Sequence, residues 1–352
     1  MGATMIDWYS GLIGYNGSHL QQNVMCELTP AGEVLWTVPR KLQVKGSYSS
    51  TVQLGRMSPT DGMVNAATSR GLLCATECLY LSGNPSKWLQ GHNVFGPSVR
   101  DLGPVLRSLV RSLPGELRPG DCDSESWAAV HRSRVDVTTT VDMGSHRQVH
   151  EWLRAAASST RSRHGRALVS GDTVYWGQHS RRWTLKAYCK FCELKAHPPE
   201  VEDWQSVLLP FTEGQLRIEL CLRGPELKPR GTLDEGVIWE YMERIEVGIM
   251  KESFSAAATV DPDMPRGVRL TLQEWMLGVD VRQTLPRPTF YRHRRAILDK
   301  FGLDIANTYQ RDTTEREVFD LGYLMRHEVH DIPSSLQGLL FKTERGPRWP
   351  KA

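Results

Sequence analysis

The chain is 352 residues long, which exceeds the usual size of one domain, so we expect two domains that each bury a core. Hydrophobic residues make up 40% of the chain and charged residues 24%, and no run approaches the roughly 18 consecutive apolar residues of a membrane span. These features predict a soluble globular protein and exclude a membrane protein, whereas a net charge of +3 does not by itself indicate a nucleic-acid partner.

The N-terminal residues carry Asp7 and no basic region followed by an apolar stretch, so we expect no signal peptide. Seven cysteines, an odd number in a long chain without such a signal, indicate reduced thiols in a cytoplasm. The first two-thirds of the chain alternates in the manner of strands broken by Gly and Pro turns. One clear helix is predicted there, over residues 147–158, from the apolar spacing of Val149, Trp152, Leu153 and Ala156.

Two segments of this part alternate apolar and charged residues. In the segment 134–138, Arg134 and Asp136 share one face of a strand and the valines between them share the other. In the segment 217–223, Arg217, Glu219 and Arg223 likewise lie opposite an apolar face. Each pattern predicts a strand with a charged face, and the simplest role of the acids is cross-strand salt bridging.

The segment 183–190 also alternates, so a strand would project Lys186, Tyr188 and Lys190 together. Cations beside a phenol favour the phenolate and attract phosphate, as a tyrosine that attacks a phosphodiester requires. The alternative is an ordinary tyrosine on a solvated sheet face. Tyr175, on the preceding predicted strand, is a second candidate nucleophile, but its neighbours in sequence offer no cation.

Cys189 and Cys192 form a C-x-x-C pair in the same region. A zinc site would need a second pair or histidine ligands at comparable spacing, and the sequence offers none. We therefore expect two thiols in a strand rather than a metal or redox site.

If the three charged strands are neighbours, they assemble the parts of a phosphodiester transesterase. Asp136 and Glu219 are candidate ligands of a divalent cation, Mg²⁺ or Mn²⁺, that polarises the scissile phosphate. Tyr188 would attack, and Lys186 and Lys190 would stabilise the charge on the phosphate oxygens. Because the phosphotyrosine link keeps the phosphodiester energy, the same site could rejoin DNA without ATP.

The last third of the chain reads as helical, with a domain boundary near Pro225 to Gly231, so the predicted domains are 5–230 and 231–352. An amphipathic helix is predicted from Asp234 to Ile249. Further on, Thr271 to Glu274 resembles a capping box that opens a short helix ending near Gly278.

A second helix is expected after Pro288, with Thr289 as its cap. Its apolar residues would face a core, and its polar side would carry Tyr291, Arg292, Arg294 and Arg295. This arrangement is typical of a helix-turn-helix that reads the major groove. The alternative is a solvated basic helix.

Several strings resemble the gene II/X replication initiators of filamentous bacteriophages. They are Leu-Gln-Gly-His-Asn-Val-Phe-Gly over 89–96, the Arg-Val-Asp strand, the Thr-Val-Tyr-Trp to Leu-Lys-Ala-Tyr-x-Lys block with Glu193, and Leu-Arg-Ile-Glu. They occur in the order of the family, and Met5-Ile-Asp-Trp resembles its N-terminus. The resemblance therefore covers most of the chain.

The resemblance implies a rolling-circle nickase that cuts one strand of the double-stranded replicative form at the origin, stays on the 5′-phosphate, and rejoins the displaced strand. Tyr188 matches the family's nucleophile. The implied fold is α+β: an antiparallel-sheet, HUH-like endonuclease domain followed by a helical DNA-binding domain. The His-hydrophobic-His metal pair of related endonucleases is absent from this sequence, so Asp136 and Glu219 are assigned as ligands by analogy, with Glu193 and His92 in reserve.

Origin DNA, double-stranded and single-stranded, is the expected partner, with a host helicase and replication proteins, in the cytoplasm of a bacterial host. Candidate DNA contacts outside the C-terminal helix are His92, Asn93, Arg181 and Arg182. The string around His92 also fits a tight turn with an anchored aromatic residue. Two other functions remain open: a non-catalytic DNA-binding regulator of phage replication, and a plasmid rolling-circle initiator.

Overall fold

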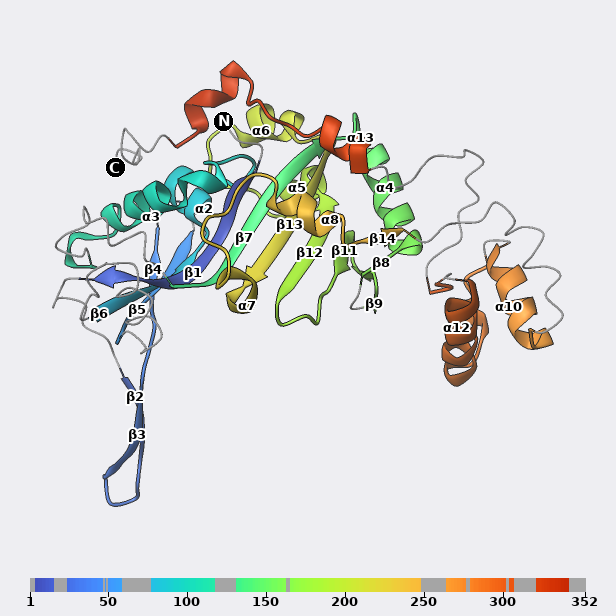
Figure 1. Ribbon diagram of the computed structural model, residues 1–352, viewed down its shortest axis with the longest axis horizontal. Coiled ribbons are helices and arrows are strands. Elements are labelled where there is room, and N and C mark those ends of the chain that lie inside the picture. Colours follow the sequence, from blue (N-terminus) through green and yellow to red (C-terminus); the bar gives the residue numbers. More distant parts are fainter. Residues whose placement is uncertain are drawn as a thin grey trace.

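The computed structural model describes residues 4–15, 24–46, 48, 50–58, 77–117, 131–162, 165–247, 264–276, 279–301, 304–306 and 321–341. Most of them form an α+β unit around one antiparallel sheet, as predicted (Figure 1). In these ranges, no helix combines the length and the apolar character needed to cross a membrane.

The central sheet has nine described strands in the order β10-β11-β12-β13-β7-β1-β6-β5-β4, and neighbouring strands pair antiparallel. Their bounds are β1 Met5–Tyr15, β4 Leu42–Lys45, β5 Thr51–Met57, β6 Glu77–Gly83, β7 His131–Asp142, β10 Leu168–Ser170, β11 Thr173–Trp176, β12 Trp183–Cys189 and β13 Gln215–Arg223. The three strands predicted to carry charged faces, β12, β13 and β7, are therefore immediate neighbours.

Apolar residues of the sheet and of several helices share one large core. The helices of this part are α2 Pro85–Gln90, α3 Leu102–Arg111, α4 His146–Ser159, α5 Lys190–Ala196, α6 Trp204–Phe211, α7 Gly224–Leu227 and α8 Val237–Met242, with the 3-10 turns η1 Val99–Asp101 and η2 Gly115–Leu117. The predicted helix at 147–158 is confirmed as α4, which the Ser145 hydroxyl caps by accepting from the Gln148 N–H.

The predicted helix from Asp234 to Ile249 is wrong in length. The helix α8 ends at Met242, and β14 (Glu246–Val247) follows, pairing with β8 (Thr160–Ser162). Ile249 lies outside the described residues. The helical spacing of apolar residues continues beyond Met242, but there the chain pairs with β8 as a strand. Spacing along the chain carries no information about such a partner.

Packing extends the first unit beyond residue 230. Apolar residues of α8 lie in the core of the sheet, together with Leu324 of α13 (Leu321–Arg326) and Phe341, which follows the 3-10 turn η4 (Ser334–Leu339). A separate core forms around α10 (Arg266–Met276), α11 (Val281–Thr284) and α12 (Arg287–Phe301). We propose that the division between units lies between residues 245 and 264, and that the chain returns to the first unit at α13.

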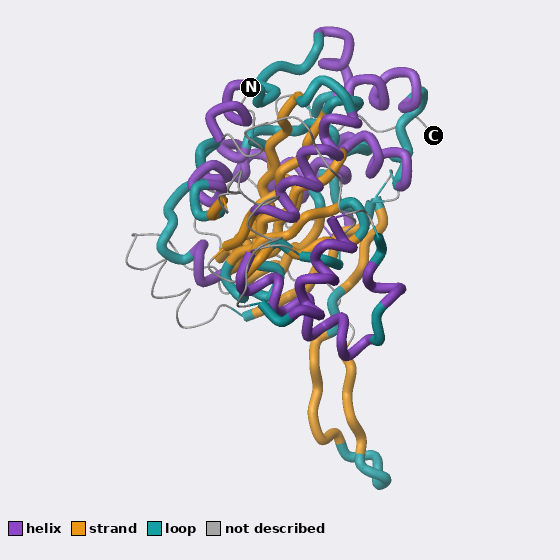
Figure 2. Tube along the Cα trace, turned by 90° about the vertical axis from the view of Figure 1, so that its right-hand side faces the viewer, coloured by secondary structure: helices purple, strands orange, loops and turns teal. Residues whose placement is uncertain are grey.

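A two-stranded ribbon, β2 (Val24–Leu28) paired with β3 (Val34–Pro39), projects away from the sheet (Figures 1 and 2). Its apolar side chains, including Trp36, are exposed. A small third sheet joins β14, β8 and β9 (Gly165–Arg166) beside α4. Neither of these small sheets contains β7, β12 or β13, the three strands with charged faces.

Candidate active site

Register brings the predicted residues onto one face of the sheet. Lys186 lies opposite Glu219, which lies opposite Thr138, and Tyr188 lies opposite Arg217, which lies opposite Thr140. Because directly opposed residues point to the same side of a sheet, these side chains share a face. We call it the polar face; its members on the three strands are Thr184, Lys186, Tyr188, Arg217, Glu219, Cys221, Asp136, Thr138 and Thr140.

The polar face is half-exposed on β11 and β12 and buried on β13 and β7. The segment after α2 covers the buried part. Gly91 ends that helix in the left-handed conformation (φ 85°), which a residue without a Cβ adopts at little cost, and the chain then crosses the face. Arg217, only 1% exposed, donates to the carbonyl oxygens of Val94 (2.7 Å) and Asn93 and to the Thr140 hydroxyl (3.1 Å). Its guanidinium therefore holds residues 93–94 against the sheet and is not accessible to a phosphate.

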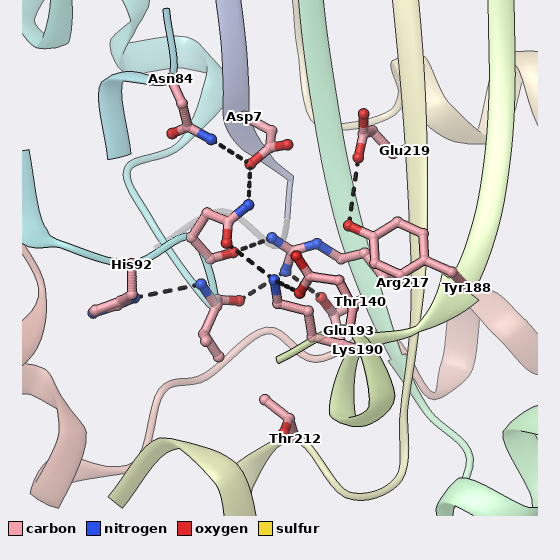
Figure 3. A network of polar contacts seen from close by, with 12 residues as sticks. Asp7, Asn84, His92, Thr140, Tyr188, Lys190, Glu193, Thr212, Arg217 and Glu219 are labelled. Carbon is pink, nitrogen blue, oxygen red and sulfur yellow. Dashed lines mark hydrogen bonds and ion pairs between the residues drawn. The ribbon is translucent and has the colours of Figure 1, made fainter. Parts of the chain in front are cut away.

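Tyr188 donates its hydroxyl to Glu219 Oε2 at 3.4 Å (Figure 3). Burial raises the pKa of the Tyr188 phenol well above its ordinary value, and the Glu219 carboxylate raises it further. The sequence-based expectation of a phenolate stabilised by flanking lysines is therefore wrong for this conformation. Lys186 Nζ lies 5.5 Å from the centre of the phenol ring, but its charge is engaged elsewhere.

Lys186 forms a salt bridge with Glu219: its Nζ lies 2.7 Å from Glu219 Oε1. Burial, reinforced by the Asp7 carboxylate, raises the pKa of Glu219 to about 7, while Lys186 acts in the opposite direction. Burial opposes the charge of Lys186, but Glu219 outweighs it and raises the lysine pKa. Near neutral pH, Glu219 is therefore present in both its protonated and its ionised form, and it lies beside the Tyr188 phenol.

Asp136 forms a salt bridge with Arg134, one of the partners that the alternative interpretation named, but the pair lies within β7 and is not cross-strand. Arg134 Nε donates to Oδ1 at 2.8 Å, and its Nη2 lies 2.5 Å from Oδ2. Two parallel hydrogen bonds hold the carboxylate in a fixed plane. Each oxygen of Asp136 accepts one hydrogen bond from Arg134, so a metal ion at Asp136 would compete with this pairing.

Lys190 does not lie where the strand pattern placed it, and its ammonium pairs with Glu193, the reserve metal ligand. The strand ends at Cys189, and Lys190 begins α5, so its fully buried side chain leaves the row of Lys186 and Tyr188. Its ammonium donates to Asn93 Oδ1 (3.0 Å) and Glu193 Oε2 (2.6 Å). Burial, followed by the Arg217 charge, lowers the pKa of Lys190 to about 8. Period-two counting failed here because the backbone changes from strand to helix at this residue.

Sequence reasoning missed Asp7 on β1, which lies in a bulge opposite β7. Its Oδ1 accepts a hydrogen bond from the side-chain amide of Asn84 at 3.0 Å (Figure 3) and from that of Asn93 at 2.8 Å. Burial would raise the pKa of Asp7, but Arg217 and the Asn93 amide outweigh it and hold the pKa below its ordinary value. A carboxylate inside the apolar run Met-Ile-Asp-Trp-Tyr was the signal that could have identified it.

The proposed DNA contacts His92 and Asn93 are buried, at 1% and 7% exposed. The His92 ring packs edge-on against Phe95, with centroids 4.6 Å apart, and burial lowers its pKa to about 3. Asn93 links Asp7 to Lys190. The alternative interpretation, a turn with an anchored aromatic residue, therefore describes this segment, because the motif fills the space over the sheet instead of facing solvent.

Tyr175 also belongs to the polar face. It lies directly opposite Lys186 on β11 and is diagonal to Tyr188, which faces Thr173. The neighbours of Tyr175 in sequence offer no cation, but the next strand supplies Lys186 directly opposite it. Two half-buried tyrosines thus flank one lysine.

The remaining basic candidates lie outside this face. Arg181 and Arg182 are exposed in the turn before β12, where Arg182 pairs with Glu226 at 2.5 Å. On α12, Tyr291, Arg292 and Arg295 are exposed. Arg294 instead donates two hydrogen bonds, each 2.6 Å, to Asp304.

The predicted caps of the C-terminal helices are wrong. Thr271 lies inside α10, where its hydroxyl contacts the Gly267 carbonyl and His293 Nδ1 of α12, and α12 begins at Arg287, before Thr289. Gly278 lies outside the described residues. The expected apolar side of α12 holds at Phe290 and Ile297, which are buried.

In the described ranges, one group of residues brings three metal-ligand atoms together. It is His150, Cys189 and Cys192, whose ligand atoms all lie within 4.8 Å of one another. No spacing along the chain predicted a histidine beside the C-x-x-C pair, since His150 comes from α4. This group lies at the end of β12 and outside the polar face, whose carboxylates do not converge in the same way.

Comparisons with known proteins agree on one family. Residues 5–240 match the family described as replication-associated protein G2P N-terminal, and residues 261–334 match its C-terminal counterpart. The chain is 30% identical to replication-associated protein G2P of Enterobacteria phage I2-2, over 97% of this chain and 99% of that protein. It is 33% identical to the G2P of Salmonella phage IKe, over 50% and 49%.

Among solved structures, a rolling circle replication initiator protein from Geobacillus stearothermophilus aligns with 72% of this chain and 90% of its own. The TM-score is 0.31 and the sequence identity is 12%.

Proposed function

Because the chain belongs to the replication-associated protein G2P family of filamentous phages, we propose that it starts rolling-circle replication by nicking one strand of the replicative form at the origin. The proposed nick leaves the protein on the 5′-phosphate through a phosphotyrosine, and the same site later rejoins the displaced strand. The observation that carries this proposal is the contact between the Tyr188 phenol and a carboxylate whose pKa lies near 7.

In the proposed reaction, Glu219 accepts the Tyr188 proton as the phenol oxygen bonds to phosphorus. The bond from phosphorus to the 3′ oxygen breaks, its electron pair stays on that oxygen, and a proton from water completes the 3′-hydroxyl. A base with a pKa near the working pH is the most effective partner for such a transfer. Resealing is the reverse: the 3′-hydroxyl releases its proton to water and its oxygen bonds to phosphorus. The bond from phosphorus to the Tyr188 oxygen breaks, and the phenol leaves with the proton held by Glu219.

Substrate binding would prepare the site for this step. Lys186 and Arg134 now neutralise Glu219 and Asp136. A DNA phosphate entering from the half-exposed side at β11 and β12 would compete for both cations, and Lys186, with 31% of its side chain exposed, is the more accessible. Withdrawal of Lys186 leaves Glu219 a stronger base, because its opposite charge has gone.

We infer that Asp7, Asp136 and Glu219 are the donors for Mg²⁺ or Mn²⁺. Carboxylate oxygens are the ligands these ions prefer, and a divalent cation would relieve the repulsion that Asp7 and Asp136 add to burial in raising the pKa of Glu219. The donor chemistry fits, although Arg134 or Lys186 must first release a carboxylate. When bound, the ion would polarise the scissile phosphate.

The origin would be recognised by the C-terminal helices, with Tyr291, Arg292 and Arg295 of α12 on the exposed side. Arg294 is better explained as a structural residue because of its pairing with Asp304. Both double-stranded and single-stranded origin DNA, a host helicase and replication proteins are the proposed partners, and the host cytoplasm is the proposed location.

A supercoiled plasmid that carries the phage origin tests the proposal. Incubation with Mg²⁺ should produce relaxed circles and a covalent protein–DNA band, and chelation of the metal should abolish both. Tyr188→Phe should remove the covalent band, whereas Tyr175→Phe, which alters the neighbouring tyrosine on the same face, should keep it. Nicking by Tyr188→Phe would refute the nucleophile assignment. Origin binding without any cleavage would instead favour the non-catalytic regulator, and cleavage of a plasmid origin alone would favour a plasmid initiator.

A further inference from the structure

A soft-metal site forms where β12 passes into α5, next to the proposed nucleophile. Cys189 is the last residue of β12 and precedes α5, and Cys192 lies in the first turn of that helix. His150 comes from the middle of α4, which packs across β12, and its Nε2 lies 3.3 Å from Cys192 Sγ. Two elements distant in sequence thus bring an imidazole and two thiols to one point.

The distances suit a tetrahedral ion. Zinc bonds of about 2.3 Å to sulfur and 2.0 Å to nitrogen place neighbouring ligand atoms about 3.5–3.8 Å apart. All three ligand atoms lie within 4.8 Å of one another, so they need to shift by about an ångström or less to surround the ion. Thiolates and imidazole select zinc over Mg²⁺, which prefers oxygen.

We propose that His150, Cys189 and Cys192 bind one zinc ion, with a water molecule as the fourth ligand. His150 and Cys192 are half-buried, so the fourth position has access to solvent. The nearby His146 is occupied otherwise: its ring stacks on Phe191 with centroids 5.3 Å apart, and its Nδ1 lies 3.6 Å from Glu213.

The zinc site would act as a clamp between α4 and the end of β12. Cys189 directly follows Tyr188 and precedes Lys190, so an ion at Cys189 fixes the backbone that carries both. Zinc would displace the thiol proton of Cys189 on binding. Metal binding is independent of the proposed nicking activity, whereas any effect of zinc on nicking rests on it.

Metal content of the full-length protein tests the site. Protein saturated with zinc and dialysed against excess Mg²⁺ should retain one zinc per chain, and Co²⁺ in its place should show a thiolate-to-cobalt charge-transfer band. Cys192→Ser and His150→Gln should each weaken zinc binding by more than about 100-fold, since loss of a ligand costs more than loss of the groups that only orient one.

Matched controls remove the same chemical groups elsewhere. Cys26→Ser alters an exposed cysteine of the projecting ribbon, and His197→Gln an exposed histidine just after α5; both should keep zinc and the cobalt band. Three results would each overturn the proposal: wild-type protein without zinc after dialysis, a cobalt spectrum without a thiolate band, or a disulfide between Cys189 and Cys192 that persists in reducing buffer. The cobalt spectrum of the wild type decides the matter even if a variant fails to fold.

Discussion

Replacement of Lys186 by Met tests whether Glu219 is the base for Tyr188. Lys186 Nζ lies 2.7 Å from Glu219 Oε1, and its charge opposes the rise in the glutamate pKa that burial and Asp7 cause. Methionine keeps the length and the apolar stem of the side chain and removes only the charge. The pKa of Glu219 should therefore rise in the variant.

The size of the effect follows from the local charges. With a pKa of about 7, roughly half of the Glu219 side chains are carboxylates at pH 7. Loss of an adjacent cation raises a carboxyl pKa by about 1–3 units, and because the Lys186 side chain is partly exposed we take about one unit. The carboxylate fraction at pH 7 then falls from about one half to about one tenth, so nicking should slow about fivefold.

Single-turnover nicking of origin plasmid from pH 5.5 to 9.5 measures this. The wild-type rate should rise about tenfold per pH unit below pH 7 and level off above it, because only the carboxylate form accepts the proton. In Lys186→Met the rising limb should move about one unit higher and reach the wild-type rate near pH 9.5. Lys228→Met, which removes an exposed lysine at the end of α7, should leave the limb in place. An unmoved limb in Lys186→Met would refute the assignment of Glu219 as base, and a further loss of rate that is equal at every pH would measure the contact of Lys186 with the phosphate.

Three further changes probe the surroundings. Because the His92 pKa is about 3 when folded and about 6.5 when unfolded, stability should fall by on the order of 4 kcal/mol as pH drops from 6.5 to 3, and thermal melts of His92→Gln should show a shallower fall. Asp7→Asn should lower the free energy of unfolding in urea by about 2–3 kcal/mol, because the buried Asn93 amide and the half-buried Asn84 amide lose their charged acceptor; an unchanged midpoint would contradict this. The double change Arg292→Gln and Arg295→Gln should leave the Tm unchanged and reduce the slope of origin affinity against salt concentration by the equivalent of up to about two phosphate contacts. Arg294→Gln should instead lower the Tm, because it removes the pairing with Asp304.

The sequence by itself determined the strands that carry the site. Period-two alternation located β7, β12 and β13 and separated their charged from their apolar residues, because that pattern is a local consequence of strand geometry. Helical spacing located α4 for the same reason. Family strings supplied the order of these segments and the expected role of Tyr188.

Only the tertiary structure decided what surrounds each charge. Glu219 became a neighbour of Tyr188 and Lys186 through cross-strand register, and Asp7 entered the site from a strand more than a hundred residues away in sequence. Burial raises the pKa of Tyr188, so this residue is a neutral phenol that needs a base and not the phenolate that its flanking lysines suggested. His150 met Cys189 and Cys192 in the same way, through packing of α4 on the sheet. Pattern along a chain fixes which way a side chain points, whereas its partners and its exposure to water depend on segments that local sequence does not specify.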